Sequence, residues 1–392
     1  MAFFRNTTVN LLNLHYAIHT LALSGGAGFF AVYLFEAGVS VPGVFVSIAL
    51  ILLGRFLIRP VIVGLSAHWG LRTMLVGGTL LSALQYPLLS EVHGAGAVLY
   101  ALIVMAAAGD TVYWSTYHAY FASLGDDSHR GHQIGAREAV AALVGIASPL
   151  LTGWLLVSYG PRVAFGITAI TVGLSSLPLF FTPEVPIARS APGAYRAALP
   201  GIVLFLGDGW ICAGYVFVWQ IALFLSLGKN FLAYGGALAV AALVGALGGL
   251  LLGRHIDAGH GKRAVWLSLG VYSVIVILRA IAVGNAAVAV LANALSALGA
   301  CLYIPTLMTI VYTRSKSAPC TLRFQVAAEG GWDIGGASGL LLAALLTAYH
   351  VPLGGSILLS LLGVAAMFVM LGHYYNIDAK RERSYSEPSP AG

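Results

Sequence analysis

Charged side chains are scarce in this chain of 392 residues: Asp, Glu, Lys and Arg make up 9% of it, whereas hydrophobic residues make up 59%. Soluble domains carry about 25% charged residues, and the mean hydropathy of the chain is +0.89. A chain of this composition cannot cover its surface with polar groups in water. A water-soluble protein is therefore excluded, and we expect an all-α integral membrane protein whose main surroundings are a lipid bilayer.

Cysteine is also rare, and no motif for nucleotide or metal binding is present. The three cysteines, Cys212, Cys301 and Cys320, are too scattered for a disulfide framework or a zinc site. Without a nucleotide-binding loop, any energy for work across the membrane would come from an ion gradient. We therefore expect no cofactor and no metal.

Long apolar runs are abundant. A run of roughly 20 apolar residues can cross a bilayer as one helix. The sequence predicts twelve such spans, six in each half of the chain. They lie near residues 11–36, 41–66, 72–90, 95–119, 137–158, 163–182, 199–226, 231–253, 263–283, 286–312, 325–348 and 353–375.

The Lys and Arg residues are distributed unevenly over the connections between these spans. Cytoplasmic loops retain Lys and Arg, while translocated loops are depleted of them. With both termini inside, nearly all Lys and Arg residues fall on the cytoplasmic side, and Arg162 and Lys229 fall on the other. This pattern predicts a protein of the cytoplasmic (inner) membrane with both termini cytoplasmic. It also accounts for the net charge of +6 without a nucleic-acid partner.

A polar, glycine-rich connection occurs twice in the chain. Residues 253–263 read GRHIDAGHGKR, and a weaker copy at residues 64–72 reads GLSAHWGLR. A second pair has a similar offset, because R-x-x-Q-x-x-x-R at 130–137 is echoed by R-x-Q-x-x-x-E at 323–329. An internal repeat at about half the chain length is typical of secondary transporters.

These connections resemble the hallmark loop of the major facilitator superfamily, Gly-x-x-x-Asp-Arg-x-Gly-Arg-Arg, which lies between helices 2 and 3 and recurs more weakly between helices 8 and 9. In this chain the second copy is the better match: Gly253, Asp257, Gly261, Lys262 and Arg263 fit the pattern, with one extra residue before Gly261. The first copy has His68 and Trp69 where the family has its acid and base. The resemblance extends over essentially the whole chain and implies a transporter rather than an enzyme.

The resemblance also implies twelve transmembrane helices in two six-helix pseudo-repeats that alternate between inward-open and outward-open states. We expect an N-terminal bundle at 1–182, a cytoplasmic linker at 183–198, a C-terminal bundle at 199–375 and a disordered cytoplasmic tail at 376–392. The partner would be a small-molecule solute bound between the bundles near the bilayer midplane. We expect a monomer.

In the family the hallmark loop acts as a latch during alternating access. Asp257, at the end of helix 8, can pair with arginines or accept hydrogen bonds from the start of a neighbouring helix. The alternative is a solvated loop that only follows the charge rule for cytoplasmic loops. The residues expected to take part in gating are Gly64, Arg72, Arg59, Arg137, Gly253, Asp257, Gly261, Lys262, Arg263, Glu329 and Asp333.

By resemblance, helices 1, 4, 7 and 10 line the central cavity, and helix 4 is the richest of them in polar groups. Asp110, Tyr113, Trp114, Tyr117 and His118 recur at helical spacings, so we expect them to share one broad face. An acid among aromatic rings can hold a proton or an organic cation. The alternative is a helix–helix hydrogen bond beside an aromatic packing stripe.

Three further helices carry candidates for binding the substrate or the proton. Histidine titrates near neutral pH and could share protons with an aspartate. The alternative for each buried histidine is a hydrogen-bonded packing role. The candidates are His15 and His19 on helix 1, Asp208, Trp219 and Gln220 on helix 7, and Tyr303 on helix 10.

Two arginines lie one turn apart on helix 2. An unpaired guanidinium near mid-span is costly, so Arg55 needs either an acidic partner or an anionic substrate. For Arg59, nearer the cytoplasmic end, we expect a structural ion pair with Glu329 or Asp333 on helix 11. We expect Arg279, near the outer end of helix 9, to extend its side chain to the membrane surface.

The segment SPLLTG at 148–153 resembles, in degraded form, the Gly-Pro-x-x-Gly-Gly segment on helix 5 of proton-coupled drug antiporters. It favours export, while Asp110, Asp208 and the two histidines motivate proton coupling. The first hypothesis is therefore proton-coupled efflux, by antiport, of a small organic solute or toxic compound. The rival hypothesis is proton-coupled uptake or exchange of an organic anion, motivated by Arg55 and Arg59. A third hypothesis, of another class, is a polytopic membrane enzyme or assembly factor. It would need catalytic groups clustered near one membrane face, whereas the candidate groups are dispersed.

Overall fold

The computed structural model describes residues 7–124, 130–256 and 261–386, and it leaves out the side chains of residues 122, 130–143, 249–256, 261–265, 305–306, 309, 312–313 and 374–386. Within these ranges the chain is helical and contains no strand. The helices of the first half are α1 (Thr7–Glu36), α2 (Val41–Trp69), α3 (Leu71–Ser90), α4 (Ala97–Leu124), α5 (Arg130–Ser158), α6 (Pro161–Ser175) and the 3₁₀ turn η2 (Leu177–Phe181).

The second half begins with the short helix α7 (Ala194–Ala197). Its long helices include one that is divided into α8 (Leu199–Cys212), the π-helical segment η3 (Ala213–Val218) and α9 (Trp219–Ser226). The others are α10 (Phe231–Ile256), α11 (Gly261–Ala282), α12 (Ala286–Lys316), α13 (Thr321–Ala348), α14 (Leu353–Leu358) and α15 (Ser360–Ser386). Residues 376–386, expected to be disordered, therefore continue α15 as a helix.

Nine helical stretches of the described chain are long and apolar enough to cross a membrane. Two further apolar stretches, 144–158 and 266–282, are shorter, and the 20 residues of α3 lie where a further span is expected. The all-α membrane fold is thereby confirmed. The count of twelve spans stays a prediction.

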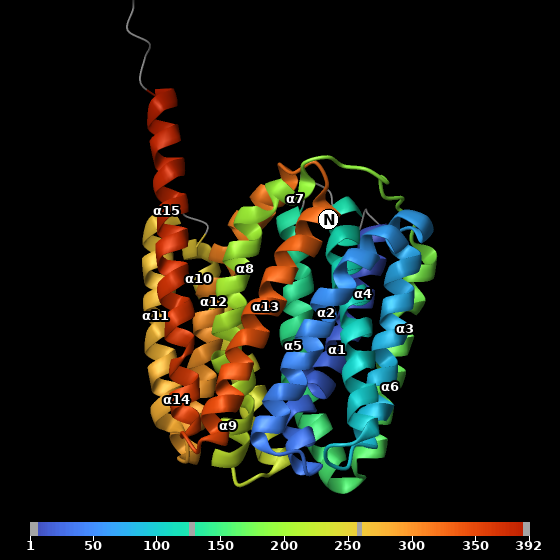
Figure 1. The fold of residues 1–392 in the computed structure, drawn as a ribbon, viewed down its shortest axis with the longest axis vertical. Helices are drawn as coiled ribbons and strands as arrows, with labels where there is room; N and C mark the ends of the chain where they lie inside the picture. Colours follow the sequence, from blue (N-terminus) through green and yellow to red (C-terminus); the bar gives the residue numbers. More distant parts are fainter. Residues whose placement is uncertain (1–6, 125–129, 257–260, 387–392) are drawn as a thin grey trace, which may run out of the picture.

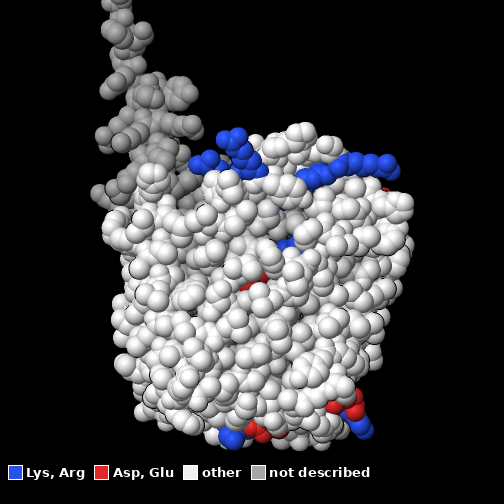
Figure 2. All heavy atoms as spheres, in the orientation of Figure 1, with Lys and Arg blue, Asp and Glu red and all other residues white. Residues whose placement is uncertain are grey.

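The long helices run side by side, with their ends at two opposite faces of the bundle (Figure 1). The helix α1 begins and α15 ends at the same face, which we call the terminal face; we call the opposite one the far face. In the view of Figure 2, Lys and Arg gather mainly at the terminal face, and the side of the bundle is almost free of charge. This is the asymmetry that the charge rule predicts, although the orientation in the membrane stays a prediction.

The first and second halves of the chain meet along two helix pairs. The helix α2 packs along α13, and α5 packs along α10. Small residues bring α5 and α10 together: a Cβ on Gly153 would lie 2.6 Å from the carbonyl oxygen of Phe231, and one on Gly235 would overlap the carbonyl of Pro149. The segment that resembles the antiporter motif therefore makes a close backbone contact between the two halves.

Contacts between the two halves also join α1 to α10 towards the far face. The hydroxyl of Tyr234 on α10 donates to the carbonyl of Gly28 on α1 at 3.1 Å. The ring of Phe29 lies edge-on to Tyr234, with centroids 5.2 Å apart, and also contacts Phe231. These contacts must separate before a solute could pass through the far face.

An exposed ion pair joins α3 to α6 at the far face. Arg162 donates to both carboxylate oxygens of Glu91, at 2.7 and 2.9 Å. This hydrogen bonding holds the pKa of Glu91 below its usual value. Because both side chains are exposed to solvent, we expect the pair to contribute little to stability.

Candidate functional site

A cavity of about 300 Å³ lies between the two halves of the chain. Its walls come from α2, α4, α8, α12 and α13, and it reaches the second turn of α13, near the terminal face. Figure 2 shows charged atoms in a hollow on the otherwise uncharged side of the bundle. The lining residues are Arg55, Trp114, His118, Phe205, Asp208, Met308, Gln325, Glu329 and Trp332.

Asp208 is the acid that faces this cavity from α8. Its Oδ1 accepts a hydrogen bond from the hydroxyl of Tyr303 at 2.8 Å, and its Oδ2 accepts one from the indole N–H of Trp332 at 3.1 Å. Among the described residues, Asp208 has no ion-pair partner. Its negative charge is thus met by neutral donors and by the cavity.

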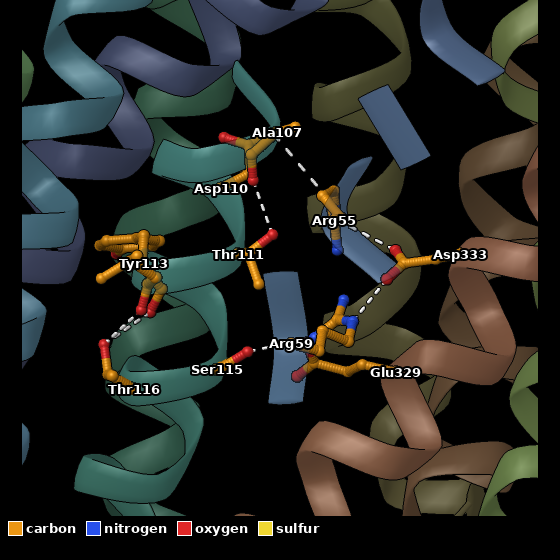
Figure 3. A network of polar contacts seen from close by, with 11 residues as sticks. Arg55, Arg59, Ala107, Asp110, Thr111, Tyr113, Ser115, Thr116, Glu329 and Asp333 are labelled. Atoms are coloured by element: carbon orange, nitrogen blue, oxygen red, sulfur yellow. Dashed lines mark hydrogen bonds and ion pairs between the residues drawn. The ribbon is translucent and has the colours of Figure 1, made fainter. Parts of the chain in front are cut away.

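A network of buried charges crosses from the first half to the second beside the cavity (Figure 3). Asp333 on α13 is fully buried, and it accepts a hydrogen bond from Arg59 while lying 3.0 Å from the Nε of Arg55. Arg59 also donates to Glu329 at 2.6 Å. Arg55 reaches back to Asp110 on α4, at 4.0 Å. Arg59 therefore contacts both acids considered for it, and Arg55 has acidic partners.

The face expected on α4 is divided into two stripes. Trp114 and His118 line the cavity. Tyr113 and Tyr117 are 1% exposed and lie against α1, where they contact the ring of His15. Consecutive helical residues point about 100° apart, so the pair 113/117 and the pair 114/118 face different neighbours. The two pairs still contact each other, since the ring centroids of Tyr113 and Trp114 lie 5.0 Å apart and those of Tyr117 and His118 lie 5.6 Å apart. A binding role for the two tyrosines stays a prediction.

His15 and His19 are buried in this tyrosine cluster and do not line the cavity. The Nδ1 of His15 donates to the carbonyl of Ser175 at 2.7 Å, which leaves Nε2 to accept from the hydroxyl of Tyr113 at 3.2 Å. His19 stacks on Tyr113, with ring centroids 3.9 Å apart. This geometry agrees with the packing alternative for both histidines.

Other candidates lie elsewhere in the second half. Trp219 is buried and donates to Asn293 at 3.0 Å, and neither Trp219 nor Gln220 is among the residues that line the cavity. Arg279 is 4% exposed, so the expectation that it extends to the membrane surface was wrong. Tyr303 touches the site only through its bond to Asp208.

Most of the second hallmark loop lies outside the part of the chain whose side chains the structure describes. Asp257 lies outside the described residues, as do the side chains of Arg137, Lys262 and Arg263. Gly253 and Gly261 belong to the ends of α10 and α11. In the first copy, a Cβ on Gly64 would meet nothing within 4 Å, so close packing does not require glycine there.

Glu184, in the connection between the halves, is a residue that sequence reasoning missed. Its carboxylate accepts from the backbone N–H of Arg72 at 2.8 Å and of Thr73 at 3.2 Å, at the start of α3. Gly70, with φ of 81°, precedes this helix, and a Cβ there would overlap the Glu184 carboxylate. The first hallmark loop has no acid of its own, and the carboxylate at this helix N-terminus comes from the linker.

We expect Glu184→Gln to lower the stability of the protein by about 1 kcal/mol, since a carboxylate at a helix N-terminus meets both free N–H groups and the helix dipole. Thermal unfolding in detergent micelles measures the loss. Glu91→Gln is the matched control, because Glu91 is also exposed but bonds a side chain rather than a helix end. Equal shifts for the two variants would contradict the capping role.

An all-helical membrane protein with a cavity between the two halves of its chain, lined by both charged and aromatic side chains, has the build of a secondary transporter. The chain matches the family model described as Major Facilitator Superfamily over residues 12–319, and it belongs to that family. It is thus a membrane transporter, not an enzyme, and its cargo is a small-molecule solute.

Two solved structures are similar to it in fold. The human organic anion transporter MFSD10 (TETRAN) has a TM-score of 0.67 at 15% identity, over 93% of this chain and 99% of that chain. The POT family transporter PepTSo has a TM-score of 0.68 at 12% identity, over 95% and 99%. No curated protein matches the chain by sequence. At such identities the likeness extends to the fold alone.

Proposed function

We propose that this transporter exports a small organic cation in exchange for protons. The observation that carries the proposal is Asp208, a carboxylate on the cavity wall whose described partners are the neutral donors Tyr303 and Trp332. Such a group can hold either a proton or a cationic solute, but not both. Competition for one carboxylate is sufficient to couple the two fluxes in opposite directions.

The charge balance around the cavity also favours cations. The cavity wall and the adjoining network together hold two arginines and four carboxyl groups, a formal surplus of two negative charges when all are ionised. A concave site lined by an excess of one sign concentrates ligands of the other sign. Protons and organic cations both reduce this surplus, whereas an organic anion would add to it.

The remaining wall suits the apolar body of such a cation. Trp114, Phe205 and Trp332 present aromatic rings, and Met308 adds a polarisable thioether. Aromatic faces attract organic cations, most strongly where water is excluded. A volume of about 300 Å³ lies at the lower end of known small-molecule sites, so the solute would be small.

The rival hypothesis, transport of an organic anion, rests on Arg55. Its guanidinium is already 3.0 Å from Asp333 and 4.0 Å from Asp110. An anion would have to compete with these carboxylates for the same charge. We therefore place the rival second, although one solved neighbour is described as an organic anion transporter.

Transport in liposomes tests the proposal. The purified protein is reconstituted with an internal pH dye and presented with benzyltrimethylammonium, neutral sugars or benzoate. We expect only the cation gradient to drive proton movement, in the opposite direction. Arg55→Gln should slow this exchange severalfold but should not change which of the three kinds of compound drives it. The reason is that Arg55 holds the cavity wall in place through its ion pairs and is not itself the cation site.

Other outcomes would reject parts of the proposal. A response confined to benzoate and lost in Arg55→Gln would select the anion hypothesis. Cation flux without proton movement would rule out antiport and leave a uniporter. Protein-free liposomes with the same gradients show how much of each signal is leak.

A further inference from the structure

Arg279 on α11 is a cation buried inside the second half of the chain. One arm of its guanidinium donates to the carbonyl oxygen of Tyr215, and the other donates to the hydroxyl of Ser296 at 2.5 Å. The guanidinium also lies over the rings of Tyr215 and Trp219, 4.1 and 4.8 Å from their centroids. No carboxylate lies within ion-pair distance of it among the described residues.

The carbonyl that Arg279 binds belongs to η3, the π-helical segment Ala213–Val218. This segment begins shortly after Asp208, in the same long helix. Single π turns are rare in proteins overall, but those that occur are often found near functional sites. Arg279 therefore joins α11 to the widened part of the helix that carries the cavity acid.

A continuous row of tyrosines leads from Arg279 to that acid. The ring of Tyr215 stacks on Tyr272, with centroids 4.1 Å apart and planes at 19°. The ring of Tyr272 contacts that of Tyr303, with centroids 4.8 Å apart. The hydroxyl of Tyr303 donates to Asp208 at 2.8 Å. All three tyrosines are at most 5% exposed, so each ring is held by its neighbours.

Packing alone does not account for an arginine at this position. A guanidinium within a membrane bundle is costly without a carboxylate, and neutral donors and aromatic faces offset only part of that cost. A leucine or methionine would fill the space without it. What an apolar residue cannot do is bind the carbonyl and the ring of Tyr215 at the same time.

We propose that Arg279 is a positioning residue for Asp208. By fixing Tyr215 it holds Tyr272 and Tyr303 in register, so that the hydroxyl of Tyr303 stays on Oδ1 and the carboxylate keeps one orientation towards the cavity. The proposal rests on the proposed function only in taking Asp208 as the cation site. The geometry from Arg279 to Asp208 is independent of what the cavity binds.

A measurement without any solute tests the positioning directly. Tyr303 is replaced by 3-fluorotyrosine, and its ¹⁹F resonance is recorded in detergent micelles. We expect Arg279→Gln to move this resonance towards the value found in Asp208→Asn, where the charged acceptor is lost. Arg279→Lys keeps the positive charge but lacks the two-armed guanidinium group, so it should move the resonance less. Arg162→Gln, at the far face, should not move it. An unchanged resonance in Arg279→Gln would overturn the proposal.

Tyr272→Leu keeps the test usable if Arg279→Gln does not fold. It removes the middle ring of the row and leaves Arg279 in place. The same displacement of the Tyr303 resonance is expected. A resonance that stays in place in Tyr272→Leu would show that the row does not transmit the position of Arg279.

The affinity for a cation provides a second, independent measurement. We expect Arg279→Gln and Tyr303→Phe each to weaken binding of benzyltrimethylammonium about tenfold, the scale of one hydrogen bond to a charged group. The double variant should also lose about tenfold, because both changes remove the same restraint. Losses that multiply to about a hundredfold would mean that the two residues act separately, which contradicts the proposal. If the unsubstituted protein does not bind the cation, the proposed function fails. The fluorine resonance of Tyr303 still tests whether Arg279 positions Asp208, because that measurement needs no bound solute.

Discussion

Asp333→Asn is expected to destabilise the protein by about 3–5 kcal/mol, the cost of removing one partner from a buried charge network. Asp333 is fully buried and is the acid that Arg55 and Arg59 share. Asparagine has nearly the same shape, but its amide carries no charge and offers one acceptor oxygen instead of two. The positive charges of the two guanidinium groups would then be balanced only by Glu329 and by the more distant Asp110.

Denaturant unfolding in mixed micelles measures this loss, and Glu91→Gln, in an exposed ion pair, serves as the matched control. We expect less than about 1 kcal/mol for the control. The double variant Arg59→Gln/Asp333→Asn should lose less than the sum of its single variants, because removing both partners leaves fewer unpaired charges. A loss of less than about 1 kcal/mol for Asp333→Asn, similar to the control, would mean that water or the remaining acids replace it.

The fold was largely predictable because the thickness of the bilayer sets the length of each apolar span, and each span can be recognised from its own composition. The seventh expected span, 199–226, coincides with the stretch from α8 to α9, and the tenth begins at Ala286 as expected. The widening of the helix at Ala213–Val218 was not predictable. It involves a carbonyl that Arg279 binds from another helix, and no local pattern encodes that contact.

The candidate site was predictable only in part. Asp208 and Arg55 were identified as charged residues within apolar spans, and His118 was identified by helical spacing; all three line one cavity. Spacing could not resolve which of two neighbouring stripes on α4 faces that cavity. Gln325 and Trp332 on α13 were missed because the family resemblance directs attention to helices 1, 4, 7 and 10. A signal was present: Gln325, Glu329 and Trp332 recur at helical spacings of four and three on α13. Glu184 had no such signal, because a linker acid has no periodic pattern.

Asp208→Asn is expected to reduce cation-driven proton movement in liposomes by at least about a hundredfold, the scale of removing a buried charge from a charged contact. The asparagine oxygen can still accept from Tyr303, so the cavity wall should keep its shape. The variant has no group that exchanges a proton at this position, and it cannot pair with a cation. Both fluxes should therefore fall together, whereas a defect of folding alone would lower the amount of protein and not the exchange per molecule.

Asp110→Asn is the informative comparison, since Asp110 is also an acid within the bundle but borders Arg55 rather than lining the cavity. We expect it to slow transport by a smaller factor and to leave binding of benzyltrimethylammonium nearly unchanged, because it acts on the charge network beside the site. If Asp110→Asn abolishes binding and Asp208→Asn does not, the cation site lies on the helices of the first half. The coupling carboxylate would then be Asp110, and Arg55, between Asp110 and Asp333, would connect proton binding to the contact between α2 and α13.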